Sequence, residues 1–121
     1  MGSALKFGFE AGLKVYVHRD AVDFRQSING LSARVEQSLG RDPFAPAVYV
    51  FRNRRADRIK ILLWDRNGFW LLLKRLEKDR FAWPRLGPVA ELSVEQLHWL
   101  LEGIDIEAVR RHPERVYHRA N

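Results

Sequence analysis

The sequence predicts an α+β fold, in which an antiparallel sheet of about four strands packs against one long helix, with a short helix near the C-terminus. Three observations support this. The stretch Ala47–Pro84 alternates polar residues with β-branched, aromatic and leucine residues between turn signals, as consecutive strands do. Apolar residues at helical spacing span Phe24–Leu39 and recur after Ser93.

Length and composition favour one globular domain. The chain has 121 residues, 46% of them hydrophobic, and no cysteine, which excludes disulfides and thiolate metal sites. We expect a single domain over residues 1–121, with a core at about 13–106 and a flexible tail at 107–121. Uncharged apolar runs such as Phe69–Leu73 are too short to span a membrane. Without a recognisable signal peptide, we expect a cytoplasmic protein with no membrane partner.

The N-terminal half predicts a strand and then a helix. Leu13–Val17 alternates and contains β-branched residues, as a short strand does. The helix has one apolar stripe, formed by Phe24, Ile28, Leu31, Val35 and Leu39. Asp20 or Asp23 is positioned to cap its start, and Gly40 to end it in a left-handed conformation. Gly30 indicates either a close approach to the sheet or a later helix start.

The central stretch predicts a meander. We expect strands at Val48–Val50, Arg58–Trp64 and Phe69–Leu76, with a short return strand at Arg80–Pro84. Asn67-Gly68 is a strong signal for the hairpin turn at residues 65–68. Residues 85–91 are expected to be a linker. Ser93 and Gln96, at capping-box spacing, predict the start of the second helix, and Gly103 its end.

Strand alternation sorts the hairpin side chains onto two faces. One face collects Ile59, Ile61, Leu63, Trp70, Leu72, Lys74 and Leu76, and we expect the Phe24–Leu39 helix to cover it. The other face collects Arg58, Lys60, Leu62, Trp64, Leu71, Leu73 and Arg75. Because basic residues accompany Trp64 there, the second face is the better functional candidate.

The excess positive charge is concentrated in this stretch. Ten Lys and Arg residues and four acidic residues lie between Arg52 and Arg80, which accounts for the net charge of +6 of the whole chain. Such clustering favours an anionic partner, above all nucleic acid. The candidate phosphate contacts are Arg52, Arg54, Arg55, Arg58, Lys60, Lys74, Arg75, Lys78 and Arg80. Trp64 and Phe69 are candidates for base stacking or for an interface.

Catalytic patterns are weak. A metal-dependent nuclease needs converging carboxylates, yet Asp20, Asp23, Asp57 and Asp65 fall where caps and turns favour aspartate. The four histidines lack metal-ligand spacing, and the chain has neither a nucleophile elbow nor a phosphate-binding glycine loop. We therefore expect no enzyme, no cofactor and no metal site.

The motifs resemble those of TnpB, the short accessory protein encoded by bacterial insertion sequences of family sixty-six. The resemblance rests on Leu39-Gly40-Arg41-Asp42-Pro43-Phe44, on VFRNRRADRIKILLWDRNGFWLLLKRLEKDRFAWP at 50–84, and on LSVEQLHWLLEGIDI at 92–106. Gln26, Asp79 and Ile106 depart from the usual lysine, glycine and tryptophan. The resemblance implies a role in transposition beside a separate, catalytic transposase.

Two hypotheses follow for the molecular activity. The first is a DNA-binding module that contacts phosphates through the basic sheet residues, with affinity that falls steeply as salt is added. The second is an adaptor that docks on the transposase or forms a homo-oligomer, through the Leu62/Trp64/Leu71/Leu73 face or the second helix.

Overall fold

A computed structural model of the chain describes residues 9–85, 87 and 89–108. Its centre is a five-stranded mixed sheet in the order β4-β3-β2-β1-β5. The strands are β1 Lys14–His18, β2 Ala47–Arg52, β3 Arg58–Asp65, β4 Gly68–Arg75 and β5 Val89–Leu92, and the main helices are α1 Ile28–Leu39 and α2 Val94–Leu101. Residues 106–108 form a further helical turn. The α+β class is confirmed, and the strand count is close to the four expected.

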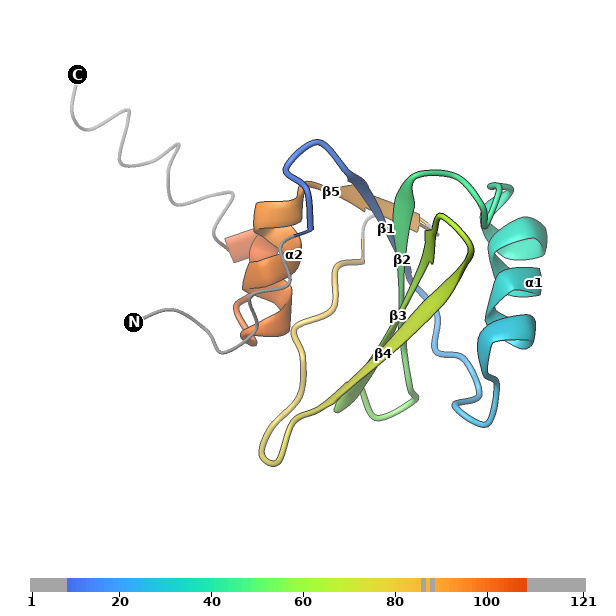
Figure 1. Cartoon of the computed structure of the whole chain (residues 1–121). Coiled ribbons are helices and arrows are strands. Elements are labelled where there is room, and N and C mark those ends of the chain that lie inside the picture. The colour runs from blue at the N-terminus through green and yellow to red at the C-terminus, as the bar shows by residue number, and fades with distance from the viewer. Residues whose placement is uncertain (1–8, 86, 88, 109–121) are drawn as a thin grey trace, which may run out of the picture.

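Only β1 and β2 pair in parallel, and the other three neighbouring pairs are antiparallel. A parallel pair needs a long crossover connection, and the segment that contains α1 provides it. Figure 1 shows the result, with α1 on one side of the sheet and α2 on the other. The expected antiparallel meander is present as β2, β3 and β4.

The predicted sorting of the hairpin side chains is confirmed by the register, which pairs Ile61 with Leu72 and Leu62 with Leu71. The expectation that the Phe24–Leu39 helix covers the Ile59/Ile61 face is wrong. Leu31 and Val35 of α1 pack with Leu62 on the face that also carries the basic residues. The Ile59/Ile61 face packs under α2 instead. Alternation of side chains along a strand identifies the two faces of the sheet, but it does not predict which helix packs against each face.

The return strand expected at Arg80–Pro84 is wrong. These residues pair with no strand of the described sheet, and Phe81 and Trp83 are instead buried in the core on the α2 side, where they are 3% and 7% exposed. The Trp83 indole N–H donates to the His18 carbonyl at 2.9 Å. The chain then passes to the far edge of the sheet, where β5 pairs with β1. The linker expected at residues 85–91 is therefore wrong in part, because its residues 89–91 belong to β5.

The helix ends follow local chemistry in part. The helix α1 begins at Ile28, later than the apolar stripe suggested, with Ser27 as its N-cap and no side-chain cap bond. Gly40 ends it in the left-handed region, at φ 62°, as predicted. The predicted capping box of α2 is confirmed, because Ser93 and Gln96 each bond the other's backbone N–H.

The structure tests the predicted tail and the predicted lack of a membrane span only in part. Of the tail predicted at 107–121, residues 109–121 lie outside the described residues. Among the residues that the structure does describe, no helix combines the length and apolar character needed to cross a membrane.

Candidate nucleic-acid interface

Two neighbouring loops close one end of the sheet. The Leu76 N–H donates to the Asp57 carbonyl at 2.8 Å, and the Phe81 N–H donates to the Ala56 carbonyl at 2.7 Å. The loop after β4 therefore lies against the β2–β3 turn, where Figure 1 shows both at the lower end of the sheet. This places residues that are far apart in the sequence on one small surface.

Asn53 organises the β2–β3 turn. Its Oδ1 accepts hydrogen bonds from the Asp57 and Arg58 N–H groups at 3.1 and 3.0 Å, and its Nδ2 donates to the Asp57 carboxylate at 2.6 Å. This last bond is the main reason that the pKa of Asp57 lies below its usual value. One amide side chain thus fixes the loop that carries Arg54 and Arg55 and the first residue of β3.

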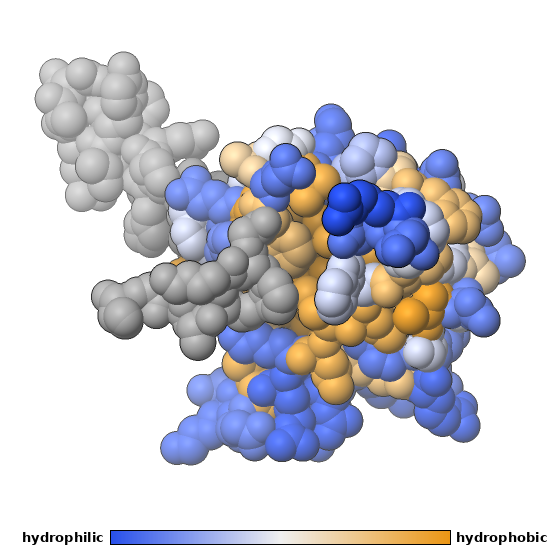
Figure 2. Space-filling model, in the orientation of Figure 1, coloured by the Kyte–Doolittle hydropathy of each residue, from blue (hydrophilic) through white to orange (hydrophobic). Residues whose placement is uncertain are grey.

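The two loops and the adjoining strand ends present six exposed basic side chains, which we call the basic end: Arg54, Arg55, Arg58, Arg75, Lys78 and Arg80. Figure 2 shows hydrophilic residues gathered at this lower end of the molecule. Arg58 and Arg75 lie directly opposite each other on β3 and β4. Arg75 also forms an exposed ion pair with Glu77, with 3.0 Å between Nε and Oε2.

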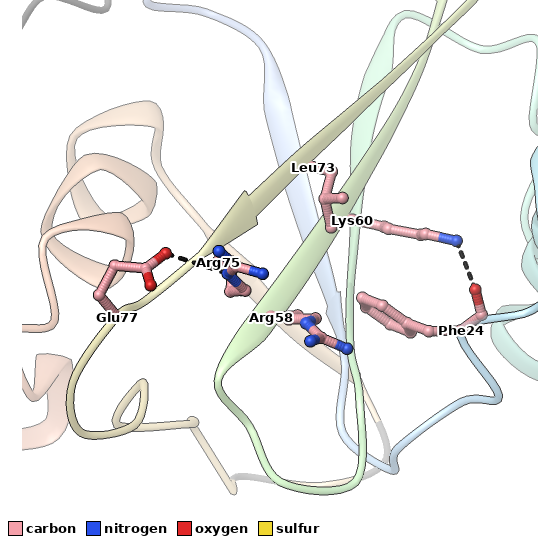
Figure 3. Close-up of a pocket in the computed structure, with 6 residues that line it drawn as sticks. All are labelled: Phe24, Arg58, Lys60, Leu73, Arg75 and Glu77. Atoms are coloured by element: carbon pink, nitrogen blue, oxygen red, sulfur yellow. Dashed lines mark hydrogen bonds and ion pairs between the residues drawn. The ribbon is translucent and has the colours of Figure 1, made fainter.

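A hollow of about 480 Å³ adjoins the Arg58–Arg75 pair on the α1 face (Figure 3). It is lined by Phe24, Arg58, Lys60, Leu73, Arg75 and Glu77. The Phe24 ring comes from the segment before α1, and the other lining residues come from β3, β4 and the loop after β4. The hollow therefore combines guanidinium groups with an aromatic ring and an aliphatic side chain.

Three of the nine predicted phosphate contacts are committed to carbonyl groups of the protein. Lys60 Nζ donates to the Phe24 and Gln26 carbonyls at 2.8 and 2.7 Å. Lys74 Nζ, on the α2 face, donates to the last carbonyl of α2 at 2.7 Å. Arg52 donates to the carbonyl of Arg19 at 3.1 Å, and burial, followed by the neighbouring Arg85, lowers its pKa.

The two candidate stacking residues lie at the opposite end of the hairpin. Trp64 and Phe69 pair next to the β3–β4 turn and pack with Phe44 in an aromatic cluster, with ring centroids 5.0 to 5.4 Å apart. Six residues of strand, about 20 Å, separate Arg58 from Trp64. The predicted stacking and phosphate contacts therefore do not form one continuous site.

Sequence reasoning missed two aromatic contributors. The apolar spacing predicts Phe24 as part of the helical stripe, yet Phe24 precedes the helix and lines the hollow. Phe44 lies in the loop between α1 and β2, is 55% exposed, and completes the aromatic cluster with its ring. Gly30, which indicates either a close approach to the sheet or a later helix start, is the sequence signal that could have placed Phe24 outside the helix. Among the described residues, no three His, Cys, Asp or Glu side chains are grouped as a metal ion would require.

Comparisons with known proteins give one matching family and two similar proteins. The IS66 Orf2-like protein family matches this chain over residues 13–111. The uncharacterized protein y4jC of Sinorhizobium fredii is 37% identical over 107 residues, which cover 88% of this chain and 92% of the relative. The uncharacterized protein y4hO of the same organism is 33% identical over 106 residues, covering 87% and 89%. No solved structure matches significantly.

Proposed function

Because this chain belongs to the IS66 Orf2-like family, whose role is accessory to transposition, we propose that it is a non-catalytic module that binds DNA through its basic end. The contacts are the exposed members Arg54, Arg55, Arg58, Arg75, Lys78 and Arg80. The transposase that performs the chemistry is a separate protein. The family is not a known catalytic family.

The observation that carries this proposal is the Arg58–Arg75 pair. Like charges directly opposite each other on neighbouring strands destabilise a sheet. Glu77 offsets part of this repulsion through its ion pair with Arg75, but both guanidinium groups remain exposed beside the hollow. A phosphate between them would remove the repulsion and accept forked hydrogen bonds from both arginines.

The surrounding charge supports a polyanion as the ligand. Arg54, Arg55, Lys78 and Arg80 extend the positive surface over two loops that are bonded to each other. Exposed arginines on adjacent loops can follow successive phosphates, and such contacts position a protein on DNA without reading its sequence. The proposal therefore expects strong salt dependence and weak sequence preference.

The test is fluorescence anisotropy of the protein with a labelled duplex and a matching single strand across a salt series. The key variant is Arg58→Gln/Arg75→Gln. Its control is Lys14→Gln/Arg41→Gln, which removes the same charge from β1 and from the exposed position after Gly40, away from the β3–β4 hairpin. Because each lost phosphate contact lowers the salt slope by about 0.9, the key variant should lose about 2.

Two results would overturn the proposal. One is a folded wild-type protein that does not bind either DNA at low salt. The other is an equal loss of affinity in the key variant and the control, because net charge rather than the Arg58–Arg75 geometry would then explain binding.

A second candidate function, an adaptor for the transposase, is favoured by a different observation. Trp70 and Leu73 on β4 are 56% and 62% exposed, so each face of this edge strand offers one large apolar side chain to a partner. A pull-down of the transposase with wild-type protein and with Trp70→Ala tests this function independently of DNA. Retention by the wild type and loss by the variant would support it.

A further inference from the structure

The two edges of the sheet are built very differently. At one edge, β5 has four residues, and its Glu91 forms an ion pair with Lys14 of β1 at 3.2 Å. At the other edge, β4 has eight residues, and Phe69–Leu73 in its middle carry no charge. Proteins usually protect an open edge with charges, proline, a bulge or a short strand. Among the described residues, no strand pairs with the outer side of β4.

The backbone of β4 offers hydrogen bonds along this edge. In an antiparallel ladder, alternate residues direct their N–H and C=O groups away from the partner strand. Counted from the two-residue loop between Asp65 and Gly68, the outward residues of β4 are 69, 71, 73 and 75. Their side chains lie on the α1 face, where Leu73 is 62% exposed. An added strand would therefore gain backbone bonds and cover an exposed leucine.

We propose that a second copy of this chain occupies the edge, with its own β4 antiparallel and a two-fold axis at Leu71. This register places Leu73 of each copy beside Phe69 of the other. Phe69 belongs to the cluster with Phe44 and Trp64, so the exposed leucine meets an aromatic surface. On the opposite face, Trp70 meets Leu72. Each copy thereby covers the exposed apolar groups of the other, as an isologous interface requires.

The charges are compatible with this arrangement. In the same register, Lys74 of one copy lies opposite Gly68 of the other, and Arg75 lies opposite Asn67. No two cations are directly opposed, and Gly68 pairs with the acidic Asp65 on its other side. A parallel neighbour in matched register would instead place Lys74 and Arg75 beside their own copies. Charge thus favours the antiparallel pairing that the two-fold axis produces.

The arrangement would double the basic end. Arg75 of the two copies would lie eight residues apart along the strand direction, or about 27 Å. A dimer could then hold two DNA segments, or two points of one segment, at a fixed separation. This consequence rests on the proposed DNA binding, but the pairing itself does not.

The first test measures mass in solution. Sedimentation equilibrium of the full chain, from low to high micromolar concentration, should give two chains per particle. Leu73→Lys should give one, because it removes the leucine that packs on Phe69 and places a charged residue on the edge strand, where natural proteins use such residues to prevent pairing. Ile104→Lys makes the same kind of change at a 36% exposed position outside the sheet, and it should remain a dimer. A monomeric wild type, or a dimer that Leu73→Lys leaves intact, would overturn the proposal.

The second test reads the register and needs no destabilising change. The chain has no cysteine, so single cysteines report on one position each. Leu71→Cys should form a disulfide-linked dimer under mild oxidation, because the two Cα atoms at the axis would lie about 5.5 Å apart. Leu73→Cys should not, because its copies would lie about 14 Å apart. Cross-linking at 73 but not at 71 would rule out this two-fold axis.

Discussion

Lys60 is a predicted phosphate contact whose ammonium group instead forms hydrogen bonds within the protein, so we leave it out of the proposed DNA contacts. Its ammonium group donates to the Phe24 and Gln26 carbonyls at 2.8 and 2.7 Å, and lies 4.9 Å from the centre of the Phe24 ring. These contacts fix the segment before α1 to β3. We expect Lys60→Met to lower stability substantially while leaving the basic end intact.

The size of the effect follows from these contacts. A hydrogen bond to a charged group contributes about 1.5–3 kcal/mol, but both carbonyls are only partly buried, so water replaces part of what is lost. Methionine retains most of the aliphatic stem and its packing. We therefore expect the free energy of unfolding to fall by about 2–4 kcal/mol. For a chain of this size, that corresponds to a fall in Tm of about 8–15 °C.

Urea unfolding followed by circular dichroism measures this change. Lys14→Met is the matched control, because Lys14 forms only an exposed ion pair, which contributes at most about 1 kcal/mol. A loss below about 0.5 kcal/mol in Lys60→Met would refute the reasoning, because hydrogen bonds of this kind would then have no net effect. The salt slope of DNA binding should stay unchanged in Lys60→Met. A fall of about 0.9 would instead assign Lys60 to a phosphate.

Three further predictions concern other contacts. Trp83→Phe removes the buried indole donor to the His18 carbonyl and should lower the free energy of unfolding by about 1–3 kcal/mol in urea. Asn53→Ala removes the side chain that holds the β2–β3 turn and should weaken DNA binding as well as stability, measured by anisotropy and urea unfolding. The pKa of Asp23 is about 2, because the side chain and then the backbone of Arg25 donate to it. Arg25→Ala should therefore raise that pKa toward 3.8 in an NMR titration.

The sign of the pH effect follows from the lowered pKa of Asp23. Its contribution to stability is fully present above the ordinary pKa of 3.8 and is lost as the pH falls through about 2. Asp23→Asn should consequently flatten the acid limb of the stability curve between these values. An unchanged acid limb would contradict this assignment. Wild-type stability in Trp83→Phe would contradict the predicted role of the indole hydrogen bond. Full DNA affinity in Asn53→Ala would contradict the predicted role of the β2–β3 turn.

Local patterns predicted the parts of the fold that local chemistry determines. The capping box at Ser93, the left-handed end at Gly40 and the two faces of the hairpin each depend on residues a few positions apart, and each is confirmed. The parallel β1–β2 pair and the position of β5 depend on which distant segments meet. Val89–Leu92 is short and directly follows Gly87 and Pro88, so its strand character comes from pairing with β1 rather than from its own sequence.

Charge clustering located the candidate site in the sequence, but charge alone does not distinguish a free cation from a committed one. Lys60 and Lys74 look no different from Lys78 in the sequence. In the structure the first two bond carbonyls from Phe24, Gln26 and Leu101, whereas Lys78 is exposed. Whether a lysine ammonium group bonds a carbonyl depends on which carbonyl lies within its reach after folding, and the spacing of residues in the sequence does not give this.

Leu73 contributes to both proposals, DNA binding at the basic end and pairing of two copies along β4. It lines the hollow beside Arg58 and Arg75, and it is also the most exposed large apolar side chain of the β4 edge. A second copy paired along β4 would cover the outer side of Leu73 and reduce the water around the arginine pair. Electrostatic attraction strengthens as the local dielectric falls. The same change would strengthen the repulsion between Arg58 and Arg75 that a bound phosphate relieves, so self-association and DNA binding should favour each other.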